Sequence, residues 1–299
     1  MSALSQKLQV QEPLRYLALG DSYTIGESVS PNERWSAQLL DSLRVKGIRE
    51  ASLRIIATTG WRTDDLMNAI QRANITEQYN LVSLLIGVNN QYQGKSIDAY
   101  KVEFEQLLKK AIELADGKKE NVFVVSIPDY AYTPFGQQRP NPEQISSQLD
   151  AFNAVNKAIT EKYGIIYFDI TPISRQGLSN PSLVASDALH PSAKMYTEWV
   201  KLMLPAFQVN ITTFLEENLE ELPTVYPNPS NDAITLELPM AERNRVKIFL
   251  IDEHGMVIKY QEIFAIPTTS MSMKNLPNGI YFYLIESHSQ RMKGKIIKN

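Results

Sequence analysis

The fold of this chain is indicated by the stretch Leu14-Arg-Tyr-Leu-Ala-Leu-Gly-Asp-Ser-Tyr-Thr24. Its first six residues are mostly apolar and predict a short buried strand over Leu14–Leu19. The Gly-Asp-Ser that follows predicts a tight turn at the strand end, with the hydroxyl of Ser22 held at its tip. That placement suits a serine nucleophile. Gly-Asp-Ser is also ordinary turn chemistry, however, and the triplet alone favours the turn.

Strand-like and helix-like segments alternate from Leu14 to about Phe207. Further strands are expected at Leu53–Ala57, Leu81–Ile86, Asn121–Ile127 and Ile165–Phe168, and helices at Glu33–Lys46, Asp64–Ala73, Ile97–Ala115, Pro142–Tyr163 and Pro191–Leu204. Alternating βα units predict an α/β domain with a five-stranded parallel sheet covered by helices. Ligands of such open sheets bind beyond the carboxyl ends of the strands.

Composition limits the possible functions. Hydrophobic residues make up 43% of the 299 residues, which is enough for a full core and argues against wholesale disorder. The net charge of −3 offers no basic excess for nucleic acid. The longest apolar runs are strand-sized, so no transmembrane segment is expected. There is no cysteine and there are only three histidines, dispersed along the chain, so we expect neither thiol chemistry nor a metal site.

Four segments with candidate chemistry fall at strand ends, which in a parallel sheet meet at one edge. Ser22 follows the first strand, Gly60 the second and Asn89 the third, and Asp187 and His190 lie between the fifth strand and the last helix. Each has a plain structural alternative: a strand-to-helix turn for Gly60, an Asx turn for Asn89, a helix cap for Asp187 and a helix-start position for His190. His190 is nevertheless the only histidine before the C-terminal region.

The ordered set of segments resembles the SGNH, or GDSL, hydrolase family over about residues 13–207. The blocks are Gly20-Asp-Ser22, Gly60, Gly87-Val-Asn89 and Asp187-Ala-Leu-His-Pro191. Any one of them is weak, but together and in this order they are specific. The resemblance implies a flavodoxin-like three-layer sandwich that hydrolyses esters, thioesters or similar acyl links without a cofactor.

The resemblance also implies a role for each matched residue. Ser22 would be the nucleophile, His190 the general base and Asp187 the group that orients His190. The oxyanion hole would comprise the backbone N–H groups of Ser22 and Gly60 and the side-chain amide of Asn89. One position departs from the family pattern, because Asn90 stands where aspartate is usual. That aspartate is generally structural, so the departure questions local loop bonding rather than catalysis.

Aromatic side chains near these blocks are candidates for the walls of a substrate pocket. An aromatic-lined cleft could hold an acyl chain or a sugar. Ordinary loop packing is the alternative for about half of them. The candidates are Tyr23, Trp61, Tyr92, Tyr130, Tyr132 and Phe135.

The chain changes character after Val209. An acidic linker is expected at 213–222, which would make 1–12 an N-terminal tail, 13–212 the hydrolase domain and 223–299 a separate module. Only strand-like pieces follow, which predicts a small all-β sandwich. They are Ala233–Leu238, Arg245–Ile251, Val257–Ile263, Ser270–Met273, Gly279–Ser287 and Lys293–Ile297.

This module resembles the type A C-terminal sorting domain of the bacterial type IX secretion system over about residues 223–299. The matching features are the opening Pro227-Asn-Pro229, the turn Asp252-Glu-His-Gly255, the hairpin Pro277-Asn-Gly-Ile-Tyr281 and a basic tail. The resemblance implies a Bacteroidetes-type bacterium, a partner in the secretion machinery and a secreted or cell-surface location. A carbohydrate-binding sandwich is the alternative, since Tyr281 and Tyr283 share one strand face.

Two functions are therefore carried forward. The first is an exported serine hydrolase that cleaves acyl esters of small molecules or polysaccharides through an acyl-enzyme. The second is a catalytically inactive surface or carbohydrate-binding protein on the same scaffold. Export would require a signal peptide that the polar N-terminal residues do not provide, so we expect that the sequence starts after one.

Overall fold

A computed structural model of the chain describes residues 7–210, 223–238, 245–264, 268–287 and 291–299. The chain divides into two compact units, Met1–Ile211 and Thr212–Asn299, and each is described by itself. The acidic linker expected at 213–222 lies outside the described residues.

The first unit is built on a five-stranded sheet in which every neighbouring pair is parallel, as the sequence predicted. Its strands are β2 (Leu14–Gly20), β3 (Ala51–Ala57), β4 (Leu81–Leu85), β5 (Val122–Val125) and β6 (Ile166–Phe168). Their spatial order is β3-β2-β4-β5-β6. The chain runs from β2 to β3 on one side and then crosses past β2 to β4 on its other side, so the direction in which strands are added reverses at β2. A crevice opens at such a switch point in flavodoxin-like sheets.

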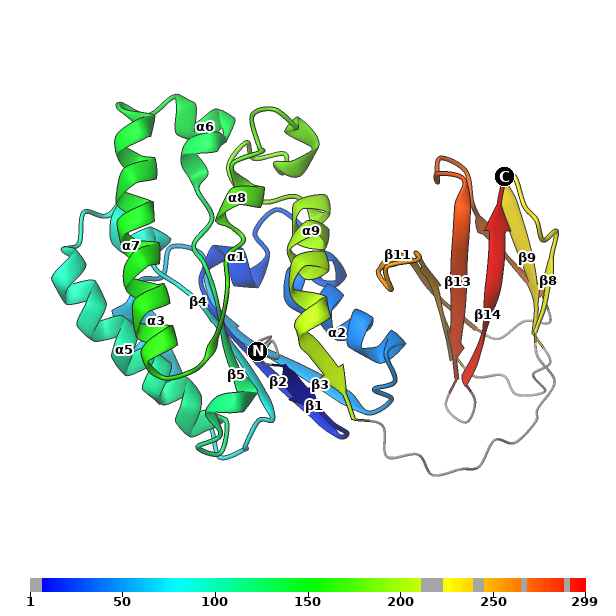
Figure 1. Ribbon diagram of the computed structural model, residues 1–299, viewed down its shortest axis with the longest axis horizontal. Helices are drawn as coiled ribbons and strands as arrows, with labels where there is room; N and C mark the ends of the chain where they lie inside the picture. Colours follow the sequence, from blue (N-terminus) through cyan, green and yellow to red (C-terminus); the bar gives the residue numbers. More distant parts are fainter. Residues whose placement is uncertain (1–6, 211–222, 239–244, 265–267, 288–290) are drawn as a thin grey trace, which may run out of the picture. The chain divides into compact units, whose positions relative to one another are not determined.

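Helices cover both faces of this sheet (Figure 1). α2 (Trp35–Val45) packs with α9 (Ala193–Met203) on one face, and α5 (Ile97–Leu114) packs with α3 (Thr63–Arg72) and α7 (Pro142–Lys162) on the other. All five residues of β4 are buried, as expected for a central strand covered on both faces. The α/β sandwich is therefore confirmed.

Short helices occupy the connections of this unit. They are α1 (Ser22–Ile25), α4 (Val88–Tyr92), α6 (Pro134–Gln137) and α8 (Thr171–Ser174), with 3₁₀ turns η1 (Pro31–Glu33), η2 (Lys119–Asn121), η3 (Tyr130–Tyr132), η4 (Pro181–Leu183) and η5 (Leu204–Ala206). Several of them lie at the carboxyl ends of the strands, where they shape the site described below.

Two local features differ from the sequence prediction. Part of the expected N-terminal tail is a strand, β1 (Leu8–Val10), which pairs in parallel with β7 (Phe207–Val209). The last helix begins at Ala193 rather than at Pro191, because the Ser192 side chain accepts a hydrogen bond from the N–H of Met195 and caps it there.

The second unit is all β. A four-stranded sheet has the order β11-β10-β13-β14 and a three-stranded sheet the order β12-β9-β8. The strands are β8 (Thr224–Tyr226), β9 (Ala233–Glu237), β10 (Arg245–Ile251), β11 (Val257–Phe264), β12 (Thr268–Ser272), β13 (Gly279–Glu286) and β14 (Arg291–Lys298). Tyr281 and Tyr283 are buried in the core of this unit, so they provide no exposed aromatic platform for a sugar.

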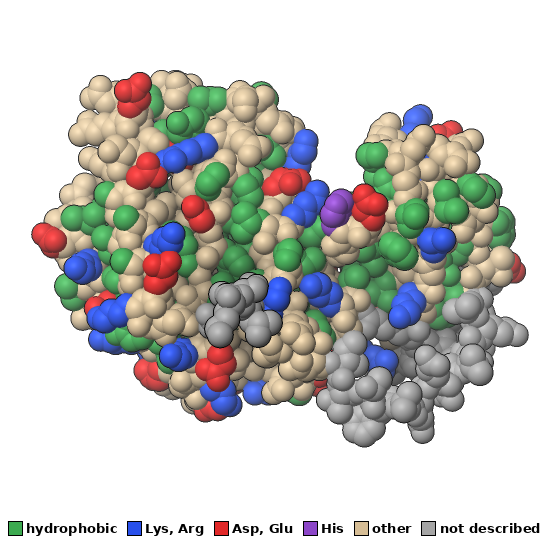
Figure 2. Space-filling view, in the orientation of Figure 1, with side chains coloured by type: hydrophobic (Ala, Val, Ile, Leu, Met, Phe, Trp, Pro, Cys, Tyr) green, Lys and Arg blue, Asp and Glu red, His purple; other side chains and the backbone are tan. Residues whose placement is uncertain are grey.

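Charged side chains of both signs are interspersed over the face of the first unit seen in Figure 2. This mixture agrees with the small net charge of the chain. Across the described ranges, none of the helices has both the length and the apolar character needed to span a membrane.

Candidate active site

Ser22 lies at the switch point of the sheet, directly beyond the carboxyl end of β2. It is the first residue of α1, and the side chain of Asp21 caps that helix by accepting the N–H of Tyr23. Gly20 allows the close turn, because a Cβ there would lie 2.5 Å from the carbonyl oxygen of Leu85 on β4. The serine side chain is thus held at the end of the strand, as the sequence predicted.

Gly60 and Asn89 lie at the ends of the two strands that flank β2. Gly60 has φ +87°, in the region that favours glycine. The Asn89 side-chain amide donates to the carbonyl oxygen of Trp61 at 3.0 Å, and the Gln93 amide donates to the carbonyl oxygen of Gly60 at 3.3 Å. These bonds tie the loop after β3 to α4. The Asn89 amide has a second N–H that can donate to a ligand.

Asn90 strengthens the same attachment. It is buried, its Oδ1 accepts the backbone N–H of Thr63 at 3.1 Å, and its Nδ2 donates to Thr63 Oγ1 at 2.6 Å. The hydroxyl of Thr63 in turn donates to the carboxylate of Glu103. The departure from the usual aspartate therefore leaves the local loop bonding intact, with an amide as the bridging group.

His190 and Asp187 lie in a turn that precedes α9. Asp187 Oδ2 is 2.5 Å from His190 Nδ1, and Asp187 Oδ1 accepts the backbone N–H groups of Leu189 and His190. Because α9 begins at Ala193 and is capped by Ser192, Asp187 is not its cap and His190 is not its first residue. The helix cap expected as the alternative for Asp187, and the helix-start position expected for His190, are therefore wrong.

The Asp187 carboxylate is held in its ionised form. Its partial burial would raise its pKa, but the hydrogen bonds from the His190 ring, from the backbone of His190 and Leu189 and from the Ser28 hydroxyl outweigh this effect and lower the pKa to about 2. The Ser28 hydroxyl donates to Oδ2 at 2.7 Å.

Asp21 has the opposite environment. Its side chain is fully buried. Burial raises its pKa to about 7, against the backbone N–H groups of Tyr23 and Gly87, which lower it. This carboxyl therefore changes charge near neutral pH, next to the serine that follows β2.

A cavity of about 190 Å³ brings the predicted residues together. Its lining includes Ser22, Gly60, Asn89 and His190. Of the aromatic candidates, Tyr23, Tyr92, Tyr130 and Phe135 also line it, whereas Trp61 and Tyr132 are not among its lining residues. Thr59, Val88 and Leu189 complete the wall and were not singled out from the sequence; each is the chain neighbour of a motif residue.

Comparison with known families decides the classification. Residues 18–197, more than half of the chain, match the model of the GDSL-like lipase/acylhydrolase family. The chain belongs to this family. Residues 224–299 match the model of the secretion system C-terminal sorting domain, so the second unit of this GDSL-family hydrolase is a sorting domain.

Solved structures share the fold of the first unit. The structure of TesA matches with a TM-score of 0.52 and 15% identity, over 64% of this chain and 97% of that one. An α/β hydrolase from the metagenome of Lake Arreo, Spain, matches with a TM-score of 0.53 and 17% identity, over 66% and 96%. An acetylxylan esterase from Geobacillus stearothermophilus matches with a TM-score of 0.52 and 18% identity, over 67% and 96%. No curated protein matches this chain.

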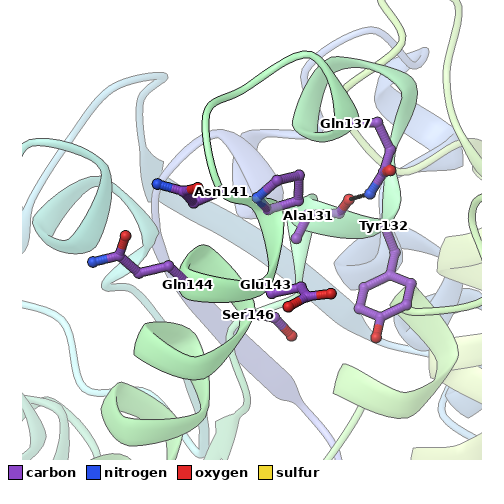
Figure 3. Close-up of a pocket in the computed structure, with 8 residues that line it drawn as sticks. Ala131, Tyr132, Gln137, Asn141, Glu143, Gln144 and Ser146 are labelled. Carbon is purple, nitrogen blue, oxygen red and sulfur yellow. Dashed lines mark hydrogen bonds between the residues drawn. The ribbon is translucent and has the colours of Figure 1, made fainter.

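A larger cavity of about 720 Å³ lies elsewhere on the hydrolase unit. Its lining is mostly polar: Ala131, Tyr132, Gln137, Asn141, Pro142, Glu143, Gln144 and Ser146. Figure 3 shows these side chains, with Gln137 bonded to the carbonyl of Ala131. None of the motif residues lines this cavity.

Proposed function

We propose that this protein is a serine esterase that cleaves carboxylic esters through an acyl-enzyme intermediate. One observation carries the proposal: the cavity lined by Ser22 also holds His190, whose ring is bonded to the ionised Asp187, together with Gly60 and Asn89. A hydroxyl, a base with its orienting acid, and donors for an oxyanion are the parts that acyl transfer requires.

In the proposed reaction, the Oγ of Ser22 attacks the ester carbonyl carbon while His190 Nε2 takes its proton. Asp187 holds Nδ1 and stabilises the imidazolium that forms. His190 then returns the proton to the leaving alcohol as the C–O bond breaks, which leaves the acyl group on Ser22. Water, deprotonated by the same imidazole, attacks the acyl-enzyme in the second half, and the acid and free Ser22 are released.

The oxyanion of each tetrahedral intermediate would accept three N–H groups. Two are the backbone groups of Ser22 and Gly60, and the third is the free N–H of the Asn89 side chain. Preorganised donors of this kind act where charge develops in the transition state. The bonds from Asn89 and Gln93 to the Gly60–Trp61 loop support the proposal, because they fix two donors relative to each other.

The size of the cavity favours a short acyl group. At about 190 Å³ it is smaller than the roughly 300–1,000 Å³ of sites for drug-sized ligands. Similarity in fold to the acetylxylan esterase agrees with a small acyl group such as acetyl, although at 18% identity it identifies the fold alone. We therefore propose acetyl or similarly short esters as substrates.

We also propose that residues 223–299 direct the enzyme through type IX secretion to the cell surface or beyond. The support is the match of residues 224–299 to the sorting-domain family. Secretion of a reporter fused to residues 223–299, and its loss in a strain without the secretion machinery, would test the route.

An inactive binding protein on the same scaffold is the competing function, and the two are separated by covalent labelling. A fluorophosphonate probe should label the wild-type protein at Ser22, and p-nitrophenyl acetate should be hydrolysed. Ser22→Ala should lose both. An unlabelled wild-type protein, or a Ser22→Ala variant with wild-type turnover, would refute the esterase.

A further inference from the structure

We propose that Arg139 at the mouth of the Ser22 cavity binds an anionic group of the substrate, so that the preferred esters carry a carboxylate or phosphate on the alcohol side. This inference rests on the esterase function proposed above and names the substrate class of the same site.

Arg139 is positioned by the aromatic wall of the cavity. Its guanidinium carbon lies 5.4 Å from the centre of the Tyr92 ring and 5.6 Å from that of Phe135. Tyr130 contacts both of these rings, with its ring centre 6.1 Å from that of Tyr92 and 6.5 Å from that of Phe135. All three aromatic residues line the cavity that holds Ser22, and Tyr92 is 47% exposed. The guanidinium therefore caps the outer side of the aromatic wall.

The main chain holds Arg139 in this place. Its backbone N–H donates to the carbonyl oxygen of Gly136 at the end of α6, in the turn that leads to α7. The side chain then has only to extend from a fixed turn to reach the two rings. Phe135, which lines the cavity, belongs to the same short helix.

Unlike Arg62 and Arg175, Arg139 forms no ion pair with a carboxylate of the described residues. Arg62 is paired with Asp64 at 2.8 Å, and Arg175 with Asp129 at 3.0 Å. Among the ion pairs between described residues, none includes Arg139. Two cation–π contacts at an exposed site are weak compared with a charge-assisted hydrogen bond to an anion.

The chemistry of the group indicates the ligand. A guanidinium presents a planar fork of N–H donors that matches the oxygens of a carboxylate or a phosphate, and the contacts with the two rings hold the group near the cavity. The small cavity accommodates the acyl group, so the alcohol must leave by the mouth. An anionic group on the alcohol would then meet the Arg139 guanidinium at the mouth. No carboxylate of the described residues forms an ion pair with this guanidinium.

The test compares esters that differ in charge but share an acetyl group and an aromatic ring. para-Acetoxybenzoate is the anionic substrate, para-acetoxybenzamide its neutral near-isostere and para-acetoxyphenyl phosphate the phosphate analogue. The quantity measured is the ratio of kcat/KM for each anionic ester to that for the neutral one. Arg139→Gln removes the charge, Arg139→Lys keeps it without the fork, and the exposed Arg72→Gln on α3 is the matched control.

We expect Arg139→Gln to lower this ratio about tenfold, largely through KM, as removal of one partly exposed charge contact allows. Arg139→Lys should keep part of the preference, Arg72→Gln should keep all of it, and added salt should reduce it in the wild type. The anionic ester with the larger loss identifies carboxylate or phosphate as the recognised group.

Equal losses on charged and neutral esters, or an unchanged ratio in Arg139→Gln, would overturn the inference and leave Arg139 as a packing residue. These results are distinct from failure of the proposed function. In that case the wild-type protein would hydrolyse none of the three esters, and the fluorophosphonate would not label Ser22.

Discussion

The imidazole of His190 and the carboxylate of Asp187 are joined by a contact of 2.5 Å between Nδ1 and Oδ2, across only three residues of chain. The same carboxylate accepts two backbone N–H groups and the Ser28 hydroxyl, so it cannot turn away without losing several bonds. Because Nδ1 faces the acid, Nε2 is the nitrogen free to exchange a proton with a substrate or with Ser22.

Replacing Asp187 by Asn should therefore damage catalysis far more than folding. An amide can hold the ring in the wrong tautomer and cannot stabilise the imidazolium, which costs about ten-thousandfold in kcat in the best-studied Ser-His-Asp enzyme. We expect a loss of about a thousand- to ten-thousandfold with p-nitrophenyl acetate. Ser28→Ala, which removes one donor to the same carboxylate, is the control and should cost much less. A kcat near that of the wild type in Asp187→Asn would exclude Asp187 from the reaction.

The Asn89 amide has two roles to separate, because it faces the cavity and also bonds to Trp61. If its free N–H stabilises the oxyanion, Asn89→Ala should lower kcat by about a hundred- to a thousandfold with little change in KM. Gln93→Ala removes the neighbouring bond to the Gly60 carbonyl without removing a donor from the cavity. Equal losses in the two variants would mean that Asn89 acts by positioning the loop.

The sequence predicted the parts of the site that depend on strand ends. Ser22, Gly60 and Asn89 follow strands whose burial pattern is plain, and parallel strands necessarily bring their carboxyl ends to one edge. Ser28 and Gln93 could not be found in the same way. Their bonds to Asp187 and to Gly60 join segments that are far apart along the chain, and no local pattern signals them.

Aromatic neighbours in sequence were a less reliable guide than strand ends. Tyr130 and Tyr132 lie in one 3₁₀ turn, yet Tyr130 lines the Ser22 cavity and Tyr132 the larger cavity. Side chains two residues apart in such a turn point in different directions.

No sign of the N-terminal strand was visible in the sequence. Leu8–Val10 pairs with β7, 199 residues further along the chain (8 to 207), and a three-residue strand has no periodicity to detect.

The hydrogen bonds from Asn90 to Thr63 and from Thr63 to Glu103 lead us to expect that one substitution lowers stability and a second restores it. Thr63 Oγ1 accepts from Asn90 and donates its single proton to Glu103. Asn90→Asp would place a second acceptor against that hydroxyl, leaving either the buried carboxylate at position 90 or the half-buried carboxylate of Glu103 without a proton donor. We expect a loss of about 1–3 kcal/mol in the free energy of unfolding, measured with denaturant. A stability equal to that of the wild type would show that the bridge contributes nothing.

Adding Glu103→Gln to Asn90→Asp should restore much of that stability. The hydroxyl of Thr63 could then donate to the new carboxylate at position 90, while the new amide at position 103 donates to Thr63 Oγ1. Glu103→Gln alone is the control. In the wild type the side chain at position 103 accepts from the Thr63 hydroxyl, and the oxygen of the new amide can do the same. Losses that simply add in the double variant would contradict the reversal of this hydrogen-bond chain.

The buried carboxyl of Asp21 should make the stability of the protein depend on pH. Its pKa in the folded protein is raised from 3.8 to about 7 by burial, so the folded state keeps a proton that the unfolded chain has already released. The stabilisation of the folded state that follows from this raised pKa is present in full below pH 3.8. It is lost as the pH rises to about 7. Asp21→Asn, which stays neutral, should therefore gain stability relative to the wild type between about pH 4 and pH 8, by up to about 4 kcal/mol.

Denaturant unfolding of both proteins at several pH values measures this difference, with the exposed Asp98→Asn on α5 as a control for exchanging a carboxylate for an amide in water. A difference that stays constant across the range would mean that Asp21 is ionised in the folded state. Because Asp21 also caps α1 through the N–H of Tyr23, an amide oxygen can keep that bond. The variant therefore tests the charge of the buried group, while the helix that begins at Ser22 retains its cap.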